Sequence, residues 1–196
     1  MTPTLESPRL ILRPLELSDA EQAQALFPHW EIVRYIRNVV PWPYPADGAY
    51  KFYRDVTLPA VARGDEWAWT LRLRSAPYQL IGAVSLFRSE TDNRGFWLGL
   101  PWQRQGLMTE ACDAVTDYWF EMLKFPVLRV PKAIANAGSR RISEKQGMRV
   151  IAWEGPRIRF WPIAIGDLGD HSGRVAPGEA RPWKMSGNVL FRWPVT

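Results

Sequence analysis

A short stretch near the middle of the chain has the residue types of a phosphate-binding turn. Gln103-Arg104-Gln105-Gly106-Leu107-Met108 lies between an apolar segment, Asn93–Leu100, and a strongly helical one, Thr109–Lys124. A strand-to-helix turn of this kind directs several backbone N–H groups to one point, beside the positive end of the helix dipole. Gly106 lets the backbone approach a ligand, and Arg104 adds a cation. The turn therefore fits a pyrophosphate, although by itself it also describes an ordinary strand–helix connection.

A second polar segment supports this interpretation. It begins 33 positions after Gln103 and reads Asn136-Ala137-Gly138-Ser139-Arg140-Arg141-Ile142-Ser143-Glu144-Lys145-Gln146-Gly147-Met148. The order of strand, Gln-x-x-Gly turn, helix, strand, Asn-x-x-Ser, helix and Glu-Lys-x-Gly-Met resembles the GNAT acetyltransferases. Phe96-Trp97-Leu98 and Thr109-Glu110-Ala111, on either side of the turn, are similar to the subgroup that includes ribosomal-protein N-terminal-alanine acetyltransferases. The resemblance covers roughly residues 9–154.

This resemblance implies an N-acetyltransferase that uses acetyl-CoA as co-substrate and an amine as acceptor. It implies that backbone groups of Trp97, Leu98 and Leu100 pair with the pantetheine arm like an added strand. It also places Asn136 and Ser139 near the thioester, with Arg140, Arg141 or Lys145 within reach of the phosphates. The cofactor-binding residues that we expect are Trp97, Leu98, Leu100, Gln103, Arg104, Gln105, Gly106, Leu107, Met108, Asn136, Ser139 and Arg141.

The chain departs from the family pattern at two positions. Met108 stands where Gly or Ala is usual, which makes the end of the turn bulkier. Ser143 stands where many members have a tyrosine that protonates the leaving thiolate. Ser139 is therefore the candidate catalytic residue, as a hydrogen-bond donor to the sulfur; the alternative is that it only caps the helix or orients the cofactor.

No side chain stands out as the general base. Asn93 occupies a position where some family members carry a glutamate, and the nearest carboxylates in sequence or on a later strand are Glu90, Asp92 and Glu154. His171 is a further option, although a lone histidine in a Gly-rich loop is usually solvated. A terminal α-amine, with a pKa near 7.7–8.0, is roughly 10–20% neutral at pH 7, whereas a free lysine is only about 0.04% neutral. The missing base thus favours an α-amine or another amine of low pKa.

The acceptor pocket is expected between the Pro41–Pro45 loop and the C-terminal segment. Trp42 and Tyr44 are its candidate lining residues, and simple packing within the loop is the alternative. No His, Cys and carboxylate cluster has metal-ligand spacing, and no Gly-x-Gly-x-x-Gly fingerprint occurs.

The elements around these segments alternate between strands and helices. Apolar alternation predicts strands, and a 3.6-residue period predicts helices. A capping-box pattern at Ser18–Glu21 predicts the first helix start, and Gly166–Gly187 is expected to be a long surface loop. The expected strands are Arg9–Pro14, Glu66–Arg74, Gln79–Arg88, Asn93–Leu100, Leu128–Ala135, Arg149–Glu154 and Asn188–Val195; the expected helices are Asp19–Phe27, Trp30–Arg37, Asp47–Ala62, Thr109–Lys124 and Gly138–Gln146. The fold class is α+β, a GNAT-like acyl-CoA N-acyltransferase fold with a mixed central sheet flanked by helices, in a single domain over residues 1–196.

Composition limits the remaining classes of function. With 46% hydrophobic and 23% charged residues, the chain has the composition of a soluble globular protein. The net charge of +5 is spread along the chain without a basic block, so a nucleic-acid partner is not expected. The single cysteine, Cys112, lies in a helical pattern and reads as a core residue, which suits a reducing cytoplasm. Neither a signal peptide nor a membrane span is expected. A homodimer, an acyl donor longer than acetyl, a non-catalytic acyl-CoA-binding or sensing domain, and an RNA-associated protein remain open.

Overall fold

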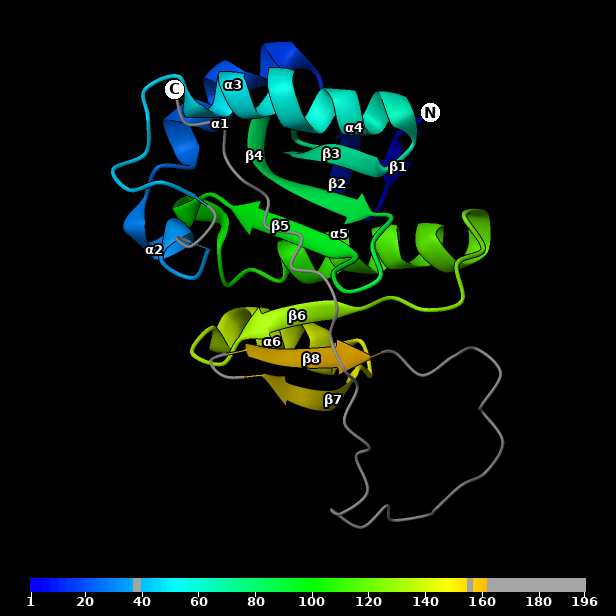
Figure 1. Cartoon of the computed structure of the whole chain (residues 1–196). Coiled ribbons are helices and arrows are strands. Elements are labelled where there is room, and N and C mark those ends of the chain that lie inside the picture. Colours follow the sequence, from blue (N-terminus) through cyan, green and yellow to red (C-terminus); the bar gives the residue numbers. More distant parts are fainter. Residues whose placement is uncertain (37–39, 155–156, 162–196) are drawn as a thin grey trace, which may run out of the picture.

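The chain forms two antiparallel sheets with helices on both sides (Figure 1). The computed structural model describes residues 1–36, 40–154 and 157–161, with side chains up to residue 150. The first sheet has the strand order β1-β2-β3-β4-β5, and the second has the order β6-β8-β7. Their bounds are β1 Leu5–Glu6, β2 Leu10–Pro14, β3 Glu66–Leu73, β4 Ala76–Phe87, β5 Arg94–Leu98, β6 Val130–Ala133, β7 Arg149–Glu154 and β8 Arg157–Trp161.

The two sheets meet where β5 lies at the edge of one and β6 at the edge of the other. Both strands point the same way in Figure 1, so their carboxyl ends lie at the same end of the molecule. Asn93, just before β5, ties them together at the opposite end. Its backbone N–H donates to the carbonyl of Arg129 at 2.7 Å, and its Oδ1 accepts the Arg129 N–H at 2.7 Å. Every strand pair within the described residues is antiparallel, so the two sheets contain no parallel pair of the kind that a mixed sheet implies.

One face of the first sheet packs on the long helix α5 (Leu107–Asp117), which continues as a π-helical turn over Tyr118–Met122. The alternating residues Trp67, Trp69 and Leu71 of β3 supply this side of the core. Cys112 is fully buried here, as its helical spacing predicted, and burial raises the pKa of its thiol. The expectation of a helix over Thr109–Lys124 is confirmed, with its start two residues earlier.

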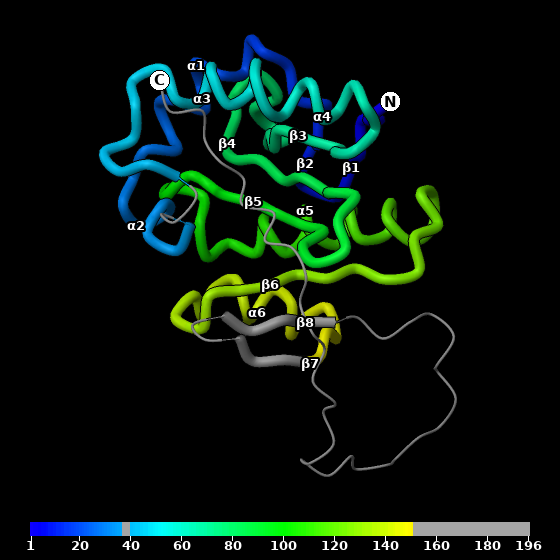
Figure 2. The backbone as a smooth tube through the Cα atoms, viewed as in Figure 1, coloured from blue at the N-terminus to red at the C-terminus, as the bar shows by residue number. Residues whose placement is uncertain are grey.

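The other face of the sheet lies under helices that form one layer above β3 and β4 (Figures 1 and 2). They pack on a smaller cluster that includes Ala68 and Leu80. Their bounds are η1 Leu17–Asp19, α1 Ala20–Leu26, α3 Gly48–Phe52, a π-helical turn η2 Tyr53–Thr57, and α4 Leu58–Arg63, which Gly64 ends at φ 77°. The short helix α2, Trp30–Val33, lies outside this layer. Because both of its faces are covered, β3 is buried along nearly its whole length.

A buried ion cluster fixes α1 to this face. Asp19, 2% exposed, accepts from Arg72 and from Arg13 at 2.7 Å. Its other oxygen accepts the Glu16 backbone N–H at 3.0 Å. The capping box predicted at Ser18–Glu21 is therefore wrong: the structure has it two residues earlier, at Glu16–Asp19. The reason is that Asp19, held by two arginines, reaches back to Glu16 instead.

Most of the remaining element predictions are confirmed, with small shifts at the ends. The strand expected at Gln79–Arg88 begins three residues earlier, because β4 already starts at Ala76. Leu128–Ala135 shortens to β6, and Gly138–Gln146 corresponds to α6 (Ala137–Lys145). Strand β8 lies in a segment without a sequence assignment. The predictions for Gly166–Gly187, His171 and Asn188–Val195 lie outside the described residues. Among the described residues, no helix is both long and apolar enough to cross a membrane.

Candidate active site

The loop between β5 and α5 exposes its backbone and buries only its last two side chains. Gly106 is the N-cap of α5 and has φ 78°, a conformation that an L side chain rarely adopts. The Leu107 and Met108 side chains are 2% and 6% exposed, whereas residues 103–106 are exposed. Met108 therefore points into the core, and its extra bulk relative to Gly or Ala does not obstruct the loop.

An arginine far away in sequence holds this loop in place. Arg9 Nη1 donates to the Gln105 carbonyl at 3.0 Å, and Arg9 Nε donates to Glu110 at 2.7 Å. Glu110 also accepts from Ser7 Oγ at 2.6 Å. Burial raises the pKa of Glu110, but these hydrogen bonds outweigh it and leave that pKa below its usual value. Sequence reasoning missed this clamp because Arg9 and Glu110 lie 101 residues apart.

The register of β5 decides which backbone groups face the junction with β6. Phe87 N–H donates to the Asn93 carbonyl at 2.9 Å, and Gly99 N–H donates to the Ile81 carbonyl at 2.8 Å. Backbone groups alternate along an antiparallel strand, so those of Trp97, which pairs with Ala83, also face β4. Only Leu98, among the three residues predicted to pair with pantetheine, turns its backbone to the open edge.

The expected backbone role of Trp97 therefore does not fit the structure, and that of Leu100 stays a prediction. Leu100 lies beyond β5, in a 3-10 turn over Leu100–Trp102, and its carbonyl accepts the Gln103 N–H at 3.2 Å. Gln103 Nε2 in turn donates to the Leu98 carbonyl at 2.9 Å. The Gln103 side chain thus fixes the end of β5 to the loop, which leaves the Leu98 N–H as the outward-facing donor.

The second predicted segment lies at the same end of the molecule, because α6 follows β6 as α5 follows β5 (Figure 1). Asn136 is the N-cap of α6, and its Oδ1 accepts the Ser139 N–H at 3.1 Å. Capping is thus done by Asn136, and the Ser139 hydroxyl is not needed for it. Ser139 is 8% exposed on the inner side of α6, and Arg141 is exposed.

Ser143 follows Ser139 by one helical turn and is fully buried. Its hydroxyl has no hydrogen-bond partner among the described residues. A buried polar group without a partner is unfavourable, so this position is not optimised for stability. It is the position where the family pattern has tyrosine.

Three aromatic rings from separate segments meet beside β5. Phe27 lies edge-on to Tyr44, with ring centroids 5.1 Å apart, and edge-on to Trp97 at 5.3 Å. Tyr44 packs on the start of α3, where a Cβ at Gly48 would lie 2.7 Å from its ring. Burial raises the pKa of the Tyr44 hydroxyl. Trp97 therefore contributes its side chain to this face of the sheet instead of its backbone to the junction.

Trp42 lies apart from these three rings. It is 45% exposed and packs against Trp30, with ring centroids 5.4 Å apart. The two loop aromatics that were predicted to share one pocket thus belong to different aromatic pairs, and Tyr44 is the one joined to Trp97 through Phe27.

The candidate bases fall into different environments. Asn93 is 2% exposed, and its Nδ2 donates to the carbonyls of Phe87 and Ser89, so it is a structural residue. Glu90 is exposed. A carboxyl that sequence reasoning did not consider, Glu66 at the start of β3, is 6% exposed, and burial raises its pKa to about 7. The Glu154 side chain lies outside the described residues.

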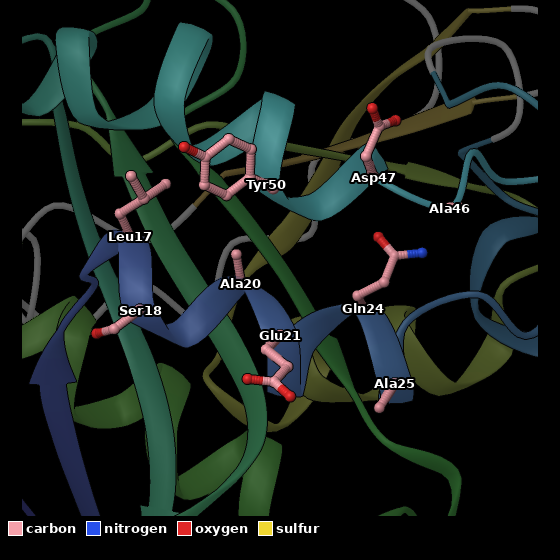
Figure 3. A pocket seen from close by; sticks show the side chains of 9 residues that line it. All are labelled: Leu17, Ser18, Ala20, Glu21, Gln24, Ala25, Ala46, Asp47 and Tyr50. Atoms are coloured by element: carbon pink, nitrogen blue, oxygen red, sulfur yellow. The ribbon is translucent and has the colours of Figure 1, made fainter.

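A separate hollow of about 590 Å³ lies between α1 and the start of α3 (Figure 3). Gln24 lines it and also donates to the Pro45 carbonyl at 3.0 Å. Glu21, Asp47 and Tyr50 are further lining residues, and none of the predicted site residues is among them. The hollow is therefore distinct from the two loops at the ends of β5 and β6.

The loop geometry fits a coenzyme A pyrophosphate. The first-turn amides of α5 have no partner within their own helix, and they begin at an exposed glycine. A Cβ at Gly106 would lie 3.5 Å from Arg9 Nη2, in the space where a ligand would approach. Arg104, exposed and at φ 62°, supplies a mobile cation on the same loop. Among the described residues, no group of three His, Cys, Asp or Glu side chains could hold a metal ion.

Comparison with protein families identifies the fold and the chemistry. Residues 9–149 match the model of the acetyltransferase (GNAT) domain. The chain belongs to the GNAT acetyltransferases. It is an acyltransferase that moves the acetyl group of acetyl-CoA to an amine.

Two curated relatives come from Bacillus subtilis (strain 168). "Probable N-acetyltransferase YjcK" is 28% identical over 155 residues, which cover 73% of this chain and 82% of the relative. YdaF, provisionally named a ribosomal N-acetyltransferase, is 25% identical over 147 residues, 70% of this chain and 76% of the relative.

Solved structures share the fold at lower identity. An acetyltransferase from Agrobacterium tumefaciens str. C58 superimposes with a TM-score of 0.67 at 20% identity, over 82% of this chain and 94% of that one. RimL, a ribosomal L7/L12 alpha-N-protein acetyltransferase in complex with coenzyme A, gives a TM-score of 0.68 at 14% identity, over 83% and 98% of the two chains.

Proposed function

We propose that the acceptor is the N-terminal α-amine of a protein or peptide. The observation that carries this proposal is the Asn93 side chain, which is fully used in hydrogen bonds to Phe87, Ser89 and Arg129. The strand beside the acceptor face therefore offers no carboxylate that directly touches an incoming amine. Such a site suits an amine that is already partly neutral near pH 7, as a terminal α-amine is and a lysine is not.

A protein of similar structure supports this proposal independently. RimL acts, by its name, on the α-amine of a ribosomal protein. An acceptor of that kind would also agree with a cytoplasmic enzyme.

We assign the cofactor as follows. The amides of residues 103–108 bind the pyrophosphate, and Arg104 and Arg141 reach the phosphates. The Leu98 N–H, which faces the open edge of β5, donates to the oxyanion that forms as the amine attacks the thioester carbonyl. Ser139 donates to the leaving sulfur. Tyr44 and Trp97 line the acceptor side together with Phe27.

The test measures thiol release from acetyl-CoA across a panel of amines. The panel contains peptides that begin with alanine or serine, the same peptides with a blocked N-terminus and an internal lysine, and small amines. We expect turnover with the free N-termini and none with the blocked ones. Turnover with only the blocked lysine peptides would refute the α-amine assignment. Tight binding of acetyl-CoA with no turnover on any amine would instead indicate a non-catalytic acyl-CoA-binding domain.

A further inference from the structure

Glu66 is a buried carboxyl that forms no ion pair with any described residue. It is the first residue of β3 and is 6% exposed. By strand alternation it lies on the same face as Ala68, under the helical layer. Burial raises the pKa of its carboxyl, and a hydrogen bond from the Ser85 side chain offsets part of this rise. A carboxyl that is buried without an ion pair costs stability, so its presence calls for another explanation.

The polar neighbour of Glu66 on the side of β5 is Ser85. Ser85 of β4 interacts with the Glu66 carboxyl and pairs in register with Gly95 of β5. Ser85, Gly95 and Trp97 are each partly exposed, although Glu66 itself is not. A Cβ at Gly95 would lie 3.2 Å from the Phe87 ring, so Phe87 packs over this glycine. By strand register, Ser85 lies between Glu66 of β3 and the Gly95–Trp97 part of β5, on the same face of the sheet.

The described residues around Glu66 offer it no counter-charge. Tyr53 of η2 packs in the same cluster as Ala68, and its buried hydroxyl has no hydrogen-bond partner among the described residues. Both Asp19 and Glu66 raise the pKa of this hydroxyl through their negative charge. The adjacent Asp65 is paired with Arg63 at 2.9 Å on the surface. Ser85 is thus the hydroxyl through which the Glu66 carboxyl can exchange a proton.

We infer that Glu66 accepts the proton of the acceptor amine through the Ser85 hydroxyl. The inference rests on the proposed function and supplies its missing base. The ammonium of the acceptor loses one proton along the Ser85 route to the Glu66 carboxylate. The neutral amine then forms the C–N bond and the C–S bond breaks. The second proton of the attacking nitrogen passes to the departing CoA thiolate, which gives the amide and free CoA thiol. Glu66 does not touch the amine; it acts through Ser85.

The pH profile of kcat/KM with an alanine-initiated peptide tests this relay. Two ionisations, that of the acceptor amine and that of Glu66, should give a logarithmic slope approaching 2 below about pH 6.5. In Glu66→Gln the slope should fall to about 1, since only the amine still titrates, and kcat/KM at pH 8 should drop about 100-fold. An unchanged slope in Glu66→Gln would overturn the inference.

Matched variants separate the relay from a structural role. Glu90→Gln removes an exposed carboxyl near β5 and should keep both the slope and the rate. Ser85→Ala should lower kcat at least 10-fold with acetyl-CoA affinity unchanged, and Ser85→Thr, which retains a hydroxyl, should restore most of it. Equal rates in Ser85→Ala and the wild type would also overturn the relay, even if Glu66→Gln failed to fold. Absence of turnover in the wild type with every amine would refute the proposed function instead.

Discussion

At the scale of single residues, Glu66 shows a conflict between stability and function. Its pKa in the folded chain, about 7, exceeds the usual 4.5, so the folded state keeps a proton that the unfolded chain releases. Wild-type stability therefore falls as pH rises from 4.5 to 7 and is level above that. Glu66→Gln lacks this loss, so it should be more stable than the wild type by up to about 3 kcal/mol above pH 7, with the gain vanishing near pH 4.5. Urea unfolding at several pH values measures this, and a gain independent of pH would contradict it.

Gly106 carries the most direct residue-scale test of the cofactor site. Gly106→Asp forces a side chain into φ 78° and places a carboxylate against the pyrophosphate. We expect CoA affinity to fall by at least about 100-fold, since backbone strain and charge repulsion act together. Gly64→Asp is the matched control, because Gly64 has φ 77° and nothing within 4 Å of its added Cβ. Calorimetric titration with CoA should find binding lost in the first variant and kept in the second; CoA binding kept in both would contradict the loop assignment.

Ser139 tests the leaving-group role. Because Asn136 already caps α6, Ser139→Ala should leave the helix intact. Turnover should fall about 10-fold or more with little change in acetyl-CoA affinity. Steady-state kinetics and a CoA titration on the same preparation decide the point. Equal losses in turnover and affinity would make Ser139 a binding residue only.

At the scale of elements, two helices that follow two edge strands build the site. Asn93 sets the spacing between the two strands, β5 and β6, through its hydrogen bonds to Phe87, Ser89 and Arg129. Asn93→Ala removes these bonds and leaves the Phe87 and Ser89 carbonyls and the Arg129 N–H without their side-chain partner. We expect a loss of about 2–4 kcal/mol of unfolding free energy and a weaker affinity for acetyl-CoA. Thr91→Ala, at an exposed neighbouring position, is the control for the urea titration. A variant as stable as the wild type would show that Asn93 does not hold the junction.

The elements also show what the sequence could predict. The two segments proposed to bind acetyl-CoA were recognisable, because a strand-to-helix turn with glycine and an Asn N-cap are local patterns. The backbone direction of Trp97 could not be predicted, since it depends on which edge of β5 pairs with β4. The contact of Arg9 with Glu110 could not be predicted either, because it joins the region just before β2 to the distant helix α5. Glu66 looked like the ordinary polar start of a strand, and only the helical layer above it makes it a buried carboxyl.

At the scale of the whole molecule, the cofactor assigned here would join both sheets. Its phosphates would contact the loop after β5, and its thioester would lie near α6 after β6. Acetyl-CoA should therefore slow amide hydrogen exchange at residues 103–109 and also at residues 136–141, with little effect in the hollow between α1 and α3. Exchange measured by mass spectrometry with and without acetyl-CoA resolves these segments. Protection of the first segment alone would contradict a site shared by the two sheets.

The central claim is acetyl transfer from acetyl-CoA to an α-amine, and one competition tests it most directly. A single peptide with a free N-terminal alanine and an internal lysine is incubated with the enzyme and acetyl-CoA at pH 7, and fragment masses locate the acetyl group. At this pH the neutral fraction of the α-amine exceeds that of the lysine by roughly several hundred-fold. We predict acetylation of the N-terminus with the lysine unmodified. Acetyl found on the lysine while the N-terminus stays free would contradict the account.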